Sequence, residues 1–159
     1  MHIWTLENWK KTYDNVDVRT GLRLRCDKSI NDEVRRVCKD FCIWLRKNYY
    51  FPIRIPIYLK SDYKIKAMDG DLVSATFFQP NSKYIEPYIR IATGDYSELL
   101  NTDGKDDALA AILGSIAHEL THYFQWINDI YLTEIGAERQ AKVYVNYIIS
   151  EYAATREHP

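Results

Sequence analysis

His118 and His122 are separated by three residues, and Glu119 directly follows the first of them. On an α-helix, residues four apart lie one turn above each other and about 40° apart around the axis. Two imidazoles placed in this way can bind one tetrahedral Zn²⁺ ion from the same face. The carboxylate of Glu119 lies about 100° further round the helix, where it can remove a proton from a water molecule. The sequence therefore predicts a catalytic zinc site with His118 and His122 as ligands and Glu119 as the general base.

The residues around this HExxH motif decide between a buried site and an exposed helix. Histidine and glutamate at ordinary helical spacing also occur on solvated helices, so the motif alone leaves that interpretation open. In the helix expected over about residues 107–127, apolar residues gather on the side away from the histidines: Leu109, Leu113, Ile116, Leu120 and Ile127. The small residues Ala111 and Ser115 lie on the histidine side. We therefore expect one face to pack on a sheet and the other to form a site.

A second helix, expected from the N-cap Thr133 to about residue 154, carries two carboxylates. Glu134 and Glu138 are four residues apart and share a helix face with apolar residues: Ala137, Ala141, Val145, Ile148 and Tyr152. Burying an unpaired carboxylate costs several kcal/mol, so partners are expected, and a Zn²⁺ ion or a histidine N–H is suitable. Exposure at the helix N-terminus, where the dipole favours acidic side chains, is the alternative.

Together these residues resemble the gluzincin metallopeptidases, in which HExxH is followed on a later helix by a ligand glutamate. The resemblance is to minimal members of that clan, such as minigluzincins and the ImmA/IrrE-like peptidases of phages and mobile elements. The stretch Glu134-Ile135-Gly136-Ala137-Glu138 matches their E-x-x-A-[DE] pattern. This match implies that Glu134 is the third zinc ligand and that Glu138 steadies His118. Helix geometry leaves Glu138 open as the ligand, because in a tight antiparallel helix pair it would lie level with His122.

The elements that must position these residues follow an α+β order. We expect an N-terminal helix, then a small, mostly antiparallel sheet of three or four strands, then the active-site helix and the glutamate helix. The helix is expected over about residues 31–49 and strands over Ile53–Leu59, Leu72–Gln79 and Tyr88–Ala92. Residues 16–25 alternate like a further strand, and a polar segment around residues 101–104 precedes the active-site helix. The family resemblance also implies that Tyr88–Ala92 is an edge strand able to pair with an extended substrate.

Length and composition limit the classes of protein to be considered. With 159 residues the chain is expected to form one domain, residues 1–159, and its high apolar and aromatic content favours a packed core. The formal net charge of −1 gives no basic excess, so no nucleic-acid partner is expected. Arg19, Arg23 and Arg25 are expected to lie on a solvated strand or loop. No signal peptide or membrane-spanning stretch is apparent, and the three cysteines are expected to be reduced core residues in a cytoplasmic protein.

We therefore expect a zinc-dependent metallopeptidase that cleaves a peptide or protein substrate with a water molecule activated by Glu119. The alternative is a catalytically silent, zinc-binding interaction module that acts as a sensor or antagonist of a partner protein. Glu119 favours the enzyme, since a structural zinc site needs no general base. Tyr131 is a candidate donor to the developing oxyanion. The substrate and the oligomeric state do not follow from the sequence.

Overall fold

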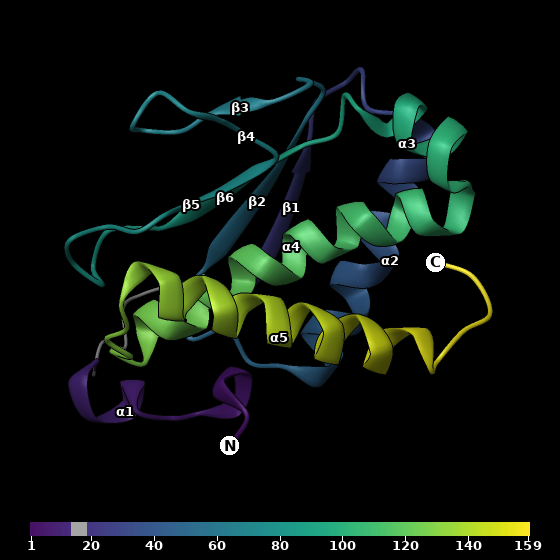
Figure 1. Cartoon of the computed structure of the whole chain (residues 1–159). Helices are drawn as coiled ribbons and strands as arrows, with labels where there is room; N and C mark the ends of the chain where they lie inside the picture. Colours follow the sequence, from purple (N-terminus) through teal and green to yellow (C-terminus); the bar gives the residue numbers. More distant parts are fainter. Residues whose placement is uncertain (14–18) are drawn as a thin grey trace.

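The chain folds as a sheet covered by helices (Figure 1), and this computed structural model describes residues 1–13 and 19–159. Two short helical segments come first, η1 (Ile3–Thr5) and α1 (Trp9–Thr12). The strands are β1 (Leu22–Cys26), β2 (Ile55–Lys60), β3 (Ile65–Lys66), β4 (Leu72–Val73), β5 (Ala75–Phe78) and β6 (Tyr88–Ala92). The longer helices are α2 (Asp32–Asn48), α3 (Tyr96–Asp103), α4 (Lys105–Ile127) and α5 (Glu134–Ala153). The predicted α+β layout is confirmed.

The main sheet has the strand order β1-β2-β6-β5 and mixed strand directions. β1 and β6 both run parallel to β2, and only β5 runs antiparallel to its neighbour β6. The sheet is therefore less antiparallel than we expected. For β1 and β2 the reason is that α2 connects them, and a strand–helix–strand crossover brings the second strand back in the same direction.

The position of β6 differs from the one that the family resemblance implied. Tyr88–Ala92 is internal, because β2 pairs with one side of it and β5 with the other. The expected strand over residues 72–79 is divided, so that Leu72–Val73 pairs with β3 in a separate hairpin and Ala75–Phe78 joins the main sheet. The edge of the main sheet that lies beside α4 is therefore β5.

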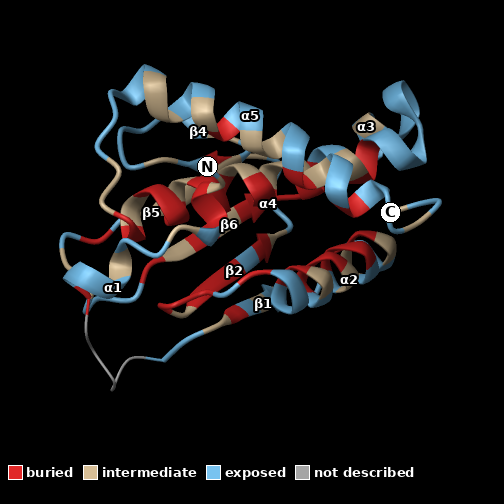
Figure 2. Ribbon diagram, turned by 90° about the horizontal axis from the view of Figure 1, so that it is seen from below, coloured by how far each residue is buried: buried red, intermediate tan, exposed pale blue. Residues whose placement is uncertain are grey.

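The hydrophobic core lies between one face of the sheet and the helices α2 and α4 (Figure 2). Alternate residues of β2 and β6 are fully buried there: Ile55, Ile57, Leu59, Ile89 and Ile91. The apolar residues predicted to share one side of α4 are also buried. The opposite face of the sheet is more exposed and carries Arg23 and Arg25, as expected for a solvated strand.

The helix ends follow from local chemistry. The side chain of Asn31 accepts hydrogen bonds from the backbone N–H groups of Glu33 and Val34 and so caps α2. The polar segment predicted around residues 101–104 is instead the end of the helix α3, which was not predicted from the sequence. Gly104 separates the two helices with a φ of 84°, a backbone conformation that favours glycine.

Further sequence-based expectations concern the stretch over residues 16–25, the cysteines and membrane-spanning helices. Residues 16–18 of the alternating 16–25 stretch lie outside the described residues, and β1 begins in the rest of the stretch, at Leu22, and ends at Cys26. All three cysteines are unpaired; Cys38 and Cys42 are buried, whereas Cys26 is partly exposed. Burial raises the pKa of the Cys42 thiol to about 12, which suits a core residue rather than a metal ligand. No helix in the described part of the chain combines the length and apolarity needed to cross a membrane.

Candidate metal centre

The two longest helices of the fold, α4 and α5, lie side by side with opposite chain directions (Figure 1). The chain reverses at the end of α4, where Asp129 takes a left-handed φ of 53°. The Thr133 hydroxyl then accepts a hydrogen bond from the backbone N–H of Gly136 and caps α5, as predicted. This short connection fixes which turn of α5 lies opposite the two histidines.

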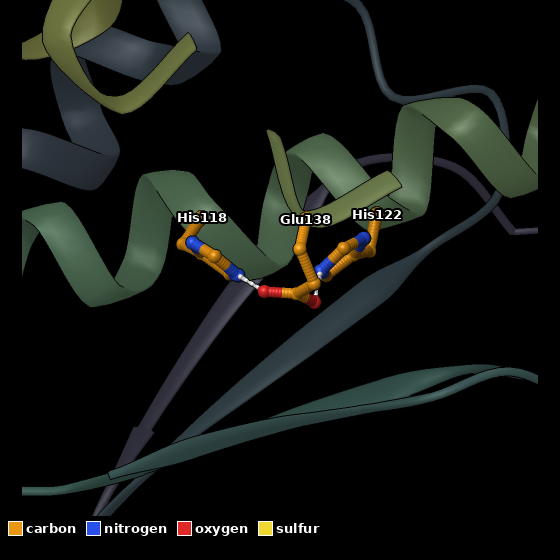
Figure 3. A group of neighbouring side chains, drawn as sticks. All are labelled: His118, His122 and Glu138. Carbon is orange, nitrogen blue, oxygen red and sulfur yellow. Dashed lines mark hydrogen bonds and ion pairs between the residues drawn. The ribbon is translucent and has the colours of Figure 1, made fainter. Parts of the chain in front are cut away.

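His118, His122 and Glu138 meet between these helices (Figure 3). The Nε2 atom of His118 lies 3.0 Å from one carboxylate oxygen of Glu138, and Nε2 of His122 lies 2.8 Å from the other. One ligand atom from each of the three residues lies within 4.8 Å of the others, so that one ion could contact all three. Two imidazoles and one carboxylate are a common ligand set for catalytic zinc, which leaves the fourth position open for water.

Gln125 orients the ring of His122. Its side-chain oxygen lies 2.8 Å from Nδ1 of His122, and its amide nitrogen donates to the backbone oxygen of Ala137 and to the side-chain oxygen of Gln140. Because both bonds of the amide group go to acceptors on α5, the Gln125 oxygen must face His122 and accept from Nδ1–H. His122 then presents Nε2 toward Glu138 and His118. Sequence reasoning missed Gln125, although it lies three residues after His122 and therefore on a neighbouring part of the helix face.

The contact between His122 and Glu138 requires a cation between them. A neutral imidazole has one N–H, and in His122 that proton is engaged with Gln125 at Nδ1. The Nε2 atom nevertheless lies 2.8 Å from a carboxylate oxygen, so the contact is favourable only if a proton or a metal ion is shared there. Burial also lowers the pKa of His118 below its usual value, although the charge of Glu138 opposes this effect. A neutral imidazole is the form that binds metal, so these residues fit a divalent ion.

Glu119 lies on the same helix, next to the group formed by His118, His122 and Glu138. The residue is 7% exposed, and burial raises the pKa of its carboxyl to about 7, against the opposing charge of His122. A carboxyl with such a pKa can both accept and release a proton near neutral pH. Glu119 and His118 line the same cavity.

Glu134 does not take the place that the family pattern implied. It is exposed in the first turn of α5 and does not belong to the group of potential ligands. The acidic side chain there faces the positive end of the helix dipole, which was the alternative interpretation of this residue. The connection between the helices is so short that Glu138, one turn further along α5, comes level with the histidines. The geometry therefore favours Glu138 over Glu134 as the third ligand.

Two cavities open beside the potential ligands. A cavity of about 600 Å³ is lined by His118 and Glu119, together with Ser74 and Ala75 at the start of β5. A second cavity, of about 630 Å³, is lined by His122 and by residues that follow β5, such as Gln79 and Pro80. Tyr131, the candidate oxyanion donor, is 89% exposed and lines this second cavity. The edge strand β5 thus runs past the site from one cavity toward the other.

The back of α4 is anchored by polar contacts inside the core. Thr121, within the HExxH motif, accepts a hydrogen bond of 3.1 Å from the indole nitrogen of Trp4 and donates to the backbone oxygen of Ala117. The hydroxyl of Tyr123 accepts from the backbone N–H of Ile53 and donates to its carbonyl oxygen. These contacts fix the rotation of α4 and hence the direction in which the two histidines point.

Comparisons with models of protein families, with curated proteins and with solved structures gave no match for this chain.

Proposed function

We propose that this protein is a zinc-dependent peptidase in which His118, His122 and Glu138 hold the metal ion and Glu119 is the general base. The observation that supports this proposal most strongly is the approach of both Nε2 atoms to a single carboxylate, at 3.0 and 2.8 Å. It also rests on Glu119, which a purely structural metal site would not require.

A bound zinc ion would polarise the carbonyl of the peptide bond and lower the pKa of a water molecule beside it. The residues of the chain supply the remaining parts of the reaction. The carboxylate of Glu119 accepts a proton from the attacking water, and the same carboxyl then donates that proton to the departing amine. The residue is 7% exposed and lines the same cavity as His118, so its carboxyl can reach a substrate bound there. Gln125 holds His122 in the tautomer that leaves Nε2 available.

The position of Glu119 also suggests the direction of the substrate. Because Glu119 protonates the departing amine, the part of the substrate that follows the cleaved bond should lie on the side of the Glu119 cavity. The part that precedes the bond then lies on the His122 side. β5 runs from the first cavity toward the second, so a substrate in this orientation is antiparallel to β5 and can pair with its free edge. In this proposal β5 takes the substrate-pairing role that the family resemblance assigned to Tyr88–Ala92.

We also propose a cytoplasmic location. The three cysteines are unpaired and two of them are buried, which is typical of proteins in reducing compartments.

The test compares zinc-loaded wild-type protein with a Glu119→Gln variant, using a broad peptide library and mass spectrometry of the products. The wild type should cleave peptides, a chelator should stop cleavage, and added zinc should restore it. Glu119→Gln should bind one zinc ion per chain and cleave nothing above background. If zinc binds but no peptide is cleaved by the wild type, the silent interaction module replaces the enzyme as the better interpretation.

A further inference from the structure

The outer face of the main sheet is the face turned away from α2 and α4. Because side chains alternate along a strand, the neighbours of the buried core residues point outward there. The strand register arranges these outward residues in two rows across the sheet: Arg23, Pro56, Tyr88 and Phe78 in one, and Arg25, Tyr58, Arg90 and Thr76 in the other. Among them only Pro56 is buried. The outer face is therefore a surface of arginine and aromatic side chains.

The positive charge of this face is not balanced by neighbouring carboxylates. Arg23, Arg25 and Arg90 form no ion pair with the residues that the structure describes. Two other cations, at the ends of β2, are paired: Arg54 with Glu86 and Lys60 with Asp27. The formal net charge of −1, from which no nucleic-acid partner was expected, is a sum over the whole chain and does not describe this one face. Three guanidinium groups on one side of a sheet attract anions.

Aromatic rings lie between these arginines. Tyr58 is 38% exposed and lies between Arg25 and Arg90 in its row. The rings of Phe78 and Tyr88 are stacked, with centroids 4.9 Å apart and planes at 21°. The guanidinium carbon of Arg90 lies 6.0 Å from the centre of the Tyr88 ring. Flat aromatic faces set among cations are the arrangement on which proteins bind unpaired bases, with the bases stacked on the rings and the phosphates near the arginines.

Arg90 also lines a small cavity on this face. Its Nε donates to the hydroxyl of Thr76 at 3.3 Å, and its Nη2 donates to the backbone oxygen of Lys66 at 3.2 Å. Two of its five N–H donors are engaged in this way, which leaves three for a ligand. The cavity has a volume of about 310 Å³ and is bounded by Arg90, by the stacked aromatic pair and by residues 67–69 after β3. It lies at the small end of the range for ligand sites and offers room for a single base.

We propose that the outer face of the sheet binds single-stranded nucleic acid, with bases on its aromatic rings and phosphates at its three arginines. Neighbouring strands are about 4.8 Å apart, so the face is about 14 Å wide from β1 to β5 and spans more than one nucleotide. A duplex does not suit it, because paired bases are stacked on one another and cannot lie on the rings. An acidic peptide would meet the same charges but has no planar groups for the rings. The metal centre lies between α4 and α5, so this inference is independent of the proposed peptidase function.

The test measures binding of a labelled single strand of about 12 nucleotides, as RNA and as DNA, by fluorescence anisotropy at about 50 mM salt. Tyr58→Ala should weaken binding by roughly 5–150-fold, because one stacked base loses its ring. Arg25→Gln should also weaken binding and should reduce the slope of log K against log salt by roughly 0.7, as expected for one lost phosphate contact. Tyr147→Ala and Arg139→Gln, which remove an exposed tyrosine and an exposed arginine from α5, are the matched controls and should bind as the wild type does.

Two further ligands separate nucleic-acid binding from simple charge attraction. The same strand annealed to its complement and a polyglutamate of equal charge should both bind more weakly than the single strand. Circular dichroism checks the fold of each variant, and Tyr58→Leu, which keeps an apolar side chain without the ring, should weaken binding as Tyr58→Ala does. The inference is wrong if single strands do not bind, if Tyr58→Leu and Arg25→Gln bind like the wild type, or if the duplex or polyglutamate binds equally well. None of these outcomes bears on the peptidase, which is tested by cleavage.

Discussion

The side-chain oxygen of Gln125 lies 2.8 Å from Nδ1 of His122, and the amide nitrogen of Gln125 is bonded to α5 at Ala137 and Gln140. A single buried amide thus joins the helix that carries the histidines to the helix that carries Glu138. The tautomer of His122 and the spacing of the two helices are therefore set by the same residue. Such partners of metal-binding histidines commonly affect affinity without contacting the metal.

Replacing Gln125 by leucine should weaken zinc binding by roughly 10–100-fold, because Nδ1 of His122 loses its acceptor and the ring its fixed orientation. Competition with a chromophoric chelator measures this affinity. Gln79→Leu, which changes an exposed glutamine outside this network, is the matched control and should bind zinc as the wild type does. Unchanged affinity in Gln125→Leu would show that His122 needs no such support.

The two acidic residues of α5 should behave differently when they are replaced. Glu138→Ala removes one of the three groups near the potential metal position and should reduce bound zinc well below one ion per chain. Glu134→Ala should keep one zinc ion, because Glu134 is exposed and lies outside the group. Elemental analysis of the dialysed proteins provides the measurement. If Glu134→Ala loses zinc and Glu138→Ala keeps it, Glu134 is the third ligand, as the family pattern implied.

Removing the hydroxyl of Tyr123 should destabilise the fold. Tyr123 is fully buried, and its hydroxyl is bonded to both the N–H and the carbonyl oxygen of Ile53. Tyr123→Phe leaves both backbone groups without that partner, which should lower the free energy of unfolding by about 1–3 kcal/mol. Urea denaturation followed by circular dichroism measures the change. Tyr131→Phe is the control, since Tyr131 is 89% exposed and should change the stability little.

Asp27 should make part of the stability depend on pH. Hydrogen bonds from the backbone N–H of Ser61 and from the Lys60 ammonium hold the pKa of this carboxyl below its usual value, against a smaller effect of burial. A lowered folded-state pKa stabilises the fold above the usual pKa, and the contribution is lost as the pH falls below about 4. Asp27→Asn should therefore be less stable than the wild type at pH 6, and the gap should narrow toward pH 3. Urea titrations at several pH values measure this trend, and a gap independent of pH would contradict it.

Local patterns in the sequence predicted the helices of the site well. The spacing of His118 and His122 and the apolar stripe of α4 depend only on helical periodicity, and both appear in the structure. Thr133 was likewise predicted as the cap of α5 from its residue type. The helix α3 was missed, because only Tyr96 among its residues is buried and it has little apolar periodicity to detect.

Features that depend on contacts between distant parts of the chain could not be predicted from local sequence patterns. The choice between Glu134 and Glu138 depends on how tightly the chain turns around Asp129, which periodicity does not encode. The edge strand of the sheet is β5 rather than β6, because residues 75–78 pair with the side of β6 that faces away from β2. The parallel pairing of β1 with β2 followed from the crossover through α2, whereas β6 reaches β2 after the hairpin β3–β4 and the strand β5. Gln125 could have been noticed from its spacing, but its bonds to Ala137 and Gln140 required the register of the two helices.

The most direct measurement is anomalous diffraction at the zinc absorption edge from crystals of the zinc-loaded protein. We expect one strong peak per chain, roughly 2.0–2.2 Å from Nε2 of His118, Nε2 of His122 and a carboxylate oxygen of Glu138. A peak bound by Glu134 in place of Glu138, or no peak between the two helices, would contradict the proposed metal centre.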